Sequence, residues 1–186
     1  MEVILFSLEL VSIALGAGSA FIFSSFFILS LKDHKVQDYE YESLKRLNTF
    51  SLMSAFLGII FYICNTALFF ETAPDFDIGQ ISAKLIIFSL ALISEMTLRK
   101  IHLPTLMRHQ QAYIHLSDKM MHHQDPLIST SVFNLISWIF IILLTSMQYN
   151  EFNSEFIFTF PQILISYIVL TFICSKVAIF WKEKTF

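Results

Sequence analysis

Two charged residues, Lys84 and Glu95, stand inside the apolar run of GQISAKLIIFSLALISEMTLRK at 79–100, a stretch that ends with Arg99 and Lys100. The two positions are about three full helical turns apart, so both side chains lie on one helical face, about 16 Å apart along the axis. The stretch is long enough to cross a bilayer, where a charge at the centre costs about 2.5–3.5 kcal/mol on insertion scales. We therefore expect the charged face to meet partner residues in neighbouring helices and not lipid.

Candidate partners for these two charges occur at two levels along the expected helices. An outer level would hold Glu9, Asn65 and Lys84, and an inner level would hold Glu95, Asn134 and Lys176. Opposite charges at one depth predict two ion pairs, Glu9 with Lys84 and Glu95 with Lys176. The alternative is that the lysines extend to the nearest interface and the carboxylates face water. We take the outer level as the better candidate for a functional site.

The composition indicates a membrane protein. The chain has 186 residues, 55% of them hydrophobic and 21 of them Phe, and a mean hydropathy of +0.65. Apolar runs long enough for a hydrocarbon core of about 30 Å occur at 3–31, 47–70, 79–99, 127–147 and 159–181. The sequence thus predicts an all-α bundle of five transmembrane helices, forming a single domain over 1–186.

The distribution of cations predicts an orientation. Lys and Arg concentrate in 32–46, in 99–119 and near the C-terminus, whereas 71–78 and 148–156 contain acids and no cation. By the positive-inside rule, the N-terminus is expected outside and the C-terminus in the cytoplasm. The polar and apolar residues of 104–125 predict a cytoplasmic amphipathic segment at the interface. Pro126 is expected in the first turn of the fourth helix.

The histidines give little support for a cofactor. All six lie on the expected cytoplasmic side, so a haem held between two membrane helices is disfavoured. The weak candidates for metal ligands are His109, His115, His122 and His123, whose spacing matches no closed zinc pattern. We predict no cofactor, with haem or a metal ion as the alternative. Known enzyme motifs are missing, which favours a non-enzyme. With a net charge of −3 and no basic aromatic surface, the sequence gives no support for nucleic-acid binding.

Several short strings carry a resemblance to a family. GAGSA at 16–20, LKD at 31–33, ISAKL at 81–85 and ISW at 136–138 are similar to those of an uncharacterised group of bacterial multipass membrane proteins. That resemblance implies location in a bacterial inner membrane and no defined activity. The group has a histidine in the outer half of its first helix, where this chain has Glu9.

Three functions fit these expectations. The first is a small transport or ion-conducting protein whose polar path is lined by Glu9, Lys84 and Glu95. The second is a non-catalytic subunit or assembly factor of a larger membrane complex, with the same charges as assembly contacts. The third is a haem- or metal-binding redox protein. The expected partners are the lipid bilayer and either further copies of the chain or other subunits.

Overall fold

The computed structural model describes residues 2–32, 38–72, 78–105, 118–149 and 159–185. Five helices dominate it, and each is long and apolar enough to cross a membrane. The elements are α1 (Glu2–Lys32), α2 (Asp38–Thr72), α3 (Ile78–Thr97), the π-helical turn η1 (Leu98–His102), α5 (Asp118–Tyr149) and α6 (Phe160–Thr185). The predicted all-helical fold with five candidate spans is confirmed.

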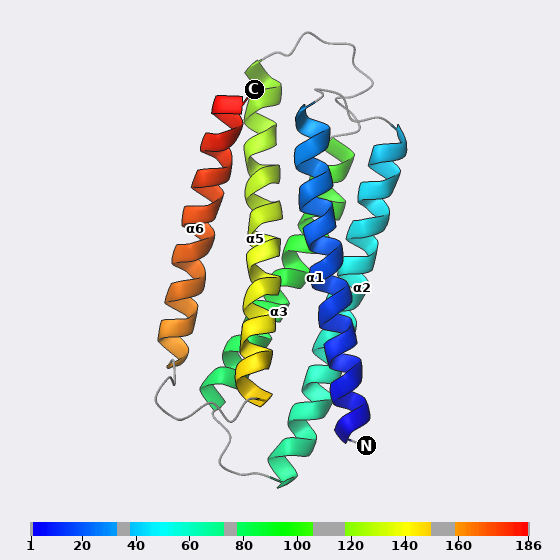
Figure 1. Cartoon of the computed structure of the whole chain (residues 1–186), viewed down its shortest axis with the longest axis vertical. Helices are drawn as coiled ribbons and strands as arrows, with labels where there is room; N and C mark the ends of the chain where they lie inside the picture. The colour runs from blue at the N-terminus through cyan, green and yellow to red at the C-terminus, as the bar shows by residue number, and fades with distance from the viewer. Residues whose placement is uncertain (1, 33–37, 73–77, 106–117, 150–158, 186) are drawn as a thin grey trace.

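The helices form one elongated bundle in which α3 and α5 are the most central (Figure 1). α1 packs along α2, and α3 lies obliquely behind α1 and α5 and contacts α2, α5 and α6. Half of the α5 span is buried, compared with 17% of the α6 span, which stands at the edge of the bundle. Residues of α3 can therefore meet partners from several other helices.

Two helices begin well before their apolar runs. α2 begins at Asp38, well before the run at 47–70, because the polar residues 38–46 continue the helix. α5 begins at Asp118, so Pro126 lies inside the helix and not in its first turn as predicted. A proline that lacks its N–H is best tolerated in the first turn, but here the helix continues on both sides of it. The predicted amphipathic segment 104–125 falls mostly on 106–117, outside the described residues.

The end of α3 departs from regular α-helix. Leu98–His102 form a π turn, after which 103–105 return to α-helix. Pro104 has no backbone N–H, and in an α-helix its ring would clash with the carbonyl of Lys100. A wider turn over this segment changes the hydrogen-bond register and relieves that clash. The proline therefore explains the local widening, which the sequence analysis did not predict.

The interior between the helices is filled by aromatic and small residues. Phe88 of α3 packs edge-on against Trp138 of α5, with ring centroids 6.1 Å apart, and both side chains are fully buried. A Cβ added at Gly16 would lie 2.0 Å from the Trp138 ring, and one at Gly58 would lie 2.8 Å from Phe88. Glycines on α1 and α2 thus make room for the two rings, so that the helices approach closely.

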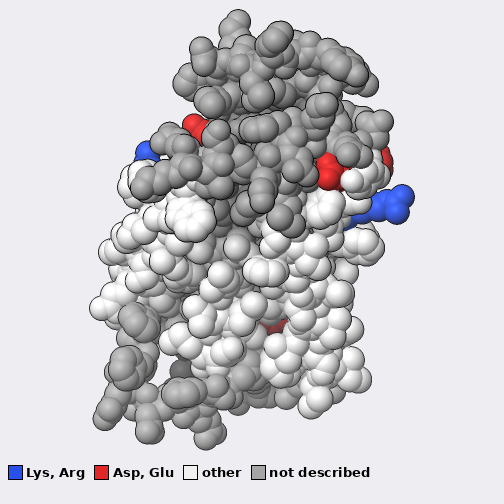
Figure 2. All heavy atoms as spheres, turned by 45° about the horizontal axis from the view of Figure 1, so that its top comes forward, with Lys and Arg blue, Asp and Glu red and all other residues white. Residues whose placement is uncertain are grey.

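The outer surface of the bundle is largely uncharged. Figure 2 shows one face with most of its visible Lys, Arg, Asp and Glu toward one end, and below them a broad band of other residues in which one recessed acidic group is visible. The exposed large side chains include Phe21, Phe56, Ile93, Phe172 and Phe180. An apolar belt of this kind suits hydrocarbon surroundings and would be costly in water.

Candidate functional site

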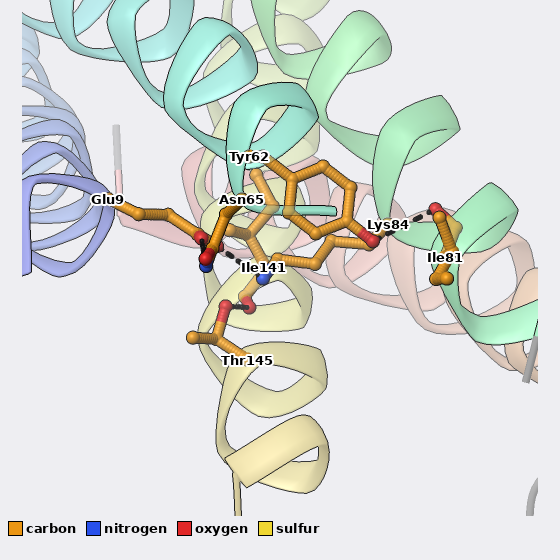
Figure 3. Close-up of polar contacts among 7 residues, drawn as sticks. All are labelled: Glu9, Tyr62, Asn65, Ile81, Lys84, Ile141 and Thr145. Atoms are coloured by element: carbon orange, nitrogen blue, oxygen red, sulfur yellow. Dashed lines mark hydrogen bonds and ion pairs between the residues drawn. The ribbon is translucent and has the colours of Figure 1, made fainter. Parts of the chain in front are cut away.

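The outer level contains a buried ion pair. Lys84 Nζ of α3 lies 2.6 Å from Glu9 Oε1 of α1, and both side chains are 0% exposed. The Asn65 amide of α2 donates a hydrogen bond of 3.0 Å to Glu9 Oε2. Figure 3 shows these three side chains converging from three helices. The predicted Glu9–Lys84 contact is thus present, with Asn65 completing it.

An aromatic ring shields the lysine of this pair. Lys84 Nζ lies 4.3 Å from the centroid of the Tyr62 ring, a cation–π distance. The Tyr62 hydroxyl donates to the Ile81 carbonyl at 3.2 Å, which fixes the ring against α3 (Figure 3). The ammonium therefore has a carboxylate and a ring face as neighbours. This combination offsets much of the cost of burying both charges.

The inner level is built around Glu95, which is 1% exposed. The amide of Asn48 and the hydroxyl of Ser51, both on α2, donate to its two carboxylate oxygens. The Asn134 amide of α5 donates to Oε1, and Asn134 in turn accepts a 3.0 Å hydrogen bond from Ser94. Neutral donors from two neighbouring helices therefore surround this carboxylate.

The predicted pair between Glu95 and Lys176 is not formed. Lys176 is exposed on α6, with its Nζ 5.7 Å from the centroid of the Phe172 ring. No cation among the described residues makes a salt bridge with Glu95. The two levels therefore differ, because the outer carboxylate has a cation beside it and the inner one does not. Counting residues from a helix end gives depth only, while the direction of a side chain depends on how each helix is rotated. Lys176 shares a depth with Glu95 but faces elsewhere.

The two levels are separated by apolar residues. On α3, Ile87, Phe88 and Ala91 lie between Lys84 and Glu95, and all three are fully buried. In this structure the six predicted site residues therefore form two clusters: Glu9, Asn65 and Lys84 in one, Glu95 and Asn134 in the other, with Lys176 in neither. No continuous line of polar side chains joins the two clusters through the described part of α3.

Asn48 and Ser51 are the site residues that the sequence analysis missed as Glu95 ligands. Asn48 lies at the start of the apolar run 47–70, directly after the charged stretch YEYESLKR at 39–46, where a polar residue attracts no notice. A usable signal exists, because Asn48 and Ser51 are three residues apart and share one helical face. Asn48 is 0% exposed, and its Oδ1 has no hydrogen-bond partner among the described residues.

Two grooves lie on the surface of the bundle. The larger, of about 570 Å³, lies between α3, α5 and α6 and is lined by residues including Ser94, Thr130, Tyr167, Thr171 and Lys176. The smaller, of about 130 Å³, lies between α1 and α5 near Ile13 and Thr145. Neither groove is lined by Glu9, Lys84 or Glu95.

The four weak candidates for metal ligands lie on or beside the first part of α5 in the sequence. His109 and His115 lie outside the described residues. His122 and His123 belong to α5, but the structure does not describe the side chains in this first part of the helix. In the described ranges no group of three or more His, Cys, Asp or Glu could hold a metal ion. His102, which is described, lies with its Nε2 3.2 Å from the Thr130 hydroxyl oxygen.

Comparisons with protein-family models, with curated proteins and with solved structures gave no match to this chain.

Proposed function

We propose that this chain is an integral membrane protein that transports or conducts a small cation, with Glu95 as the ion-binding group. Five apolar helices support the membrane location. The placement of Lys and Arg supports an outside N-terminus and a cytoplasmic C-terminus. The bacterial inner membrane, which the local strings imply, stays a prediction.

The observation that carries the proposal is the lack of a cation beside a buried carboxylate. Glu95 accepts hydrogen bonds from Asn48, Ser51 and Asn134, which stabilise its negative charge. In its ionised form Glu95 would carry a charge that no described side chain neutralises. An ionisable group of this kind inside a membrane is costly, and it is commonly part of an ion or proton pathway. A proton or a monovalent cation would supply the missing positive charge.

The outer cluster has a different role in this proposal. Glu9 and Lys84 neutralise each other, and the Tyr62 ring covers the ammonium of Lys84. Their ion pair therefore stabilises the contact between α1 and α3. We therefore assign the ion-binding role to the inner level and not to the outer level, which was the better candidate from the sequence.

The test is ion flux into liposomes that contain the purified protein, driven by a membrane potential, with internal dyes for H⁺ and for Na⁺. We expect one ion to enter faster than in protein-free liposomes. Glu95→Gln should abolish that excess, because glutamine carries no charge to bind the ion. The matched control is Glu42→Gln, since Glu42 is an exposed carboxylate of α2 that pairs with Lys45. Flux equal to that of protein-free liposomes for both ions would reject the proposal.

A second candidate, a non-transporting subunit of a larger membrane complex, is favoured by one observation. Phe88 and Trp138 pack solidly between the two polar levels, as expected of a chain whose buried charges hold its own helices together and conduct no ion. Native mass spectrometry of the protein extracted in mild detergent distinguishes the two, because a subunit should carry other chains at fixed stoichiometry.

A further inference from the structure

The groove between α3, α5 and α6 has the chemistry of a lipid site. Its wall is mostly apolar, with Leu90, Ile93, Phe133, Ile168 and Ile179 among its lining residues. Along α6 it runs from Tyr167 to Ile179, a distance of about 18 Å at 1.5 Å per residue. That length is close to half of the hydrocarbon thickness of about 30 Å. The groove can therefore take one acyl chain within one leaflet.

The polar groups of the groove are arranged by depth. Lys176 lines it five residues before Trp181, the last residue of the α6 span, and is exposed. Thr171 lies about 7.5 Å deeper along the helix. Its side chain is only 9% exposed, and its hydroxyl has no hydrogen-bond partner among the described residues. A helical threonine can bond the carbonyl of the preceding turn, and Thr130 does so here at 2.7 Å. The Thr171 hydroxyl is thus a buried donor without a described partner at the wall of the groove, and rotation about its Cα–Cβ bond would turn it toward a ligand there.

We propose that this groove binds one anionic membrane phospholipid. The phosphate would lie beside the Lys176 ammonium, near the end of the span. A glycerol ester carbonyl, deeper in the bilayer, would accept a hydrogen bond from Thr171. One acyl chain would then lie along the apolar wall toward Leu90 and Tyr167. A zwitterionic lipid offers the same chain and ester but a headgroup with no net charge.

This inference is independent of ion transport and needs only the membrane location. Its position gives it a structural consequence, because Ser94 lines the groove and donates to Asn134, which in turn donates to Glu95. A bound chain would cover the side of the inner cluster that faces α6. It would also fill the space between α6, the least buried helix, and the rest of the bundle.

The experiment uses the full-length protein in mild detergent with equal amounts of phosphatidylglycerol and phosphatidylcholine that carry the same acyl chains. Native mass spectrometry counts the lipids retained. We expect one phosphatidylglycerol to be preferred. Lys176→Gln should lower its retention about fivefold, which corresponds to the value of one lysine near an anionic surface. Lys45→Gln, a change to an exposed lysine of α2 outside the groove, should leave retention unchanged.

A second variant tests the depth of the site separately. Thr171→Val removes the hydroxyl but keeps the shape, and it should lower the retention of both lipids, since both carry the ester. Equal retention of the two lipids by the unmodified protein would overturn the proposal. So would full phosphatidylglycerol retention by Lys176→Gln, or a lipid-free dimer, which would make the groove an interface between two copies.

Discussion

Glu9 and Glu95 are both buried carboxylates, but they differ in the charge around them. Glu9 has Lys84 at 2.6 Å, while Glu95 has three neutral donors. Removing one member of a buried pair leaves an uncompensated charge and is costly, whereas removing both can be nearly neutral. The outer cluster should therefore behave as a unit in stability measurements.

The change that tests this is Glu9→Gln, Lys84→Met and the two together. Each single variant should lose about 3–5 kcal/mol of stability, because the remaining charge is stranded at 0% exposure. The double variant should recover most of that loss. Thermal unfolding in detergent, followed by helical circular dichroism, gives the coupling between the two sites. Simple addition of the two single effects would show that the residues do not interact.

Asn65 and Asn134 show how far residue-level prediction can reach. Both occur at three- or four-residue spacing with other small or polar residues, and such a stripe marks a helix face that packs on another helix. The outer pair followed from matched depth and opposite sign. Lys176 and Glu95 also match in depth and are opposite in sign, but they do not form the predicted pair. The long side chain of Lys176 can extend to an interface, and α6 is rotated so that this side chain is exposed.

At the scale of the helix, close packing of α1 depends on one of its two glycines. The space where a Gly16 Cβ would lie is occupied by the Trp138 ring at 2.0 Å, whereas a Cβ at Gly18 would meet nothing within 4 Å. The string GAGSA at 16–20 contains both glycines, and its composition does not tell which of them packs against another helix. The position of Trp138 on α5 decides which of them is essential.

We accordingly expect Gly16→Ala to destabilise the protein by about 1–3 kcal/mol, the usual cost of overpacking. Gly18→Ala is the matched control and should be neutral or slightly stabilising, since alanine favours a helix over glycine. The measurement is the midpoint of thermal unfolding of the two variants in the same detergent. Equal midpoints would mean that α1 and α5 are not packed as described.

The boundaries of the helices were less predictable than their existence. The five spans followed from hydropathy alone, because each run is as long as a bilayer is thick. α5 begins at Asp118 because the polar residues before Pro126 continue its helix, and hydropathy does not register polar helix. The π turn at Leu98–His102 depends on hydrogen-bond register, which no apolar pattern reports.

At the scale of the whole molecule, the distribution of charge predicts an orientation in the membrane. Residues near the start of α3 and near its end lie at opposite ends of the bundle. The sequence has cations beside only one of these ends, around Arg99 and Lys100. That asymmetry is the physical basis for the predicted cytoplasmic side.

Single cysteines test the orientation in intact bacterial cells that express the protein. The free cysteines Cys64 and Cys174 are first changed to serine. A membrane-impermeant maleimide should then label Ile78→Cys, at the start of α3, and should not reach Lys100→Cys. Permeabilised cells serve as the control, because both positions are exposed and both should then react. Labelling of position 100 alone in intact cells would reverse the assignment.

The bond between Glu9 and Lys84 also bears on how the protein is made. Each of the two helices carries a charge that costs about 2.5–3.5 kcal/mol at the centre of a membrane helix. α1 emerges first, and Asn65 of α2 is the first partner that its carboxylate can meet. Neutralisation waits for Lys84, which arrives only with α3. We therefore expect the first three helices to enter the membrane together, with α1 remaining at the insertion machinery until α3 is synthesised.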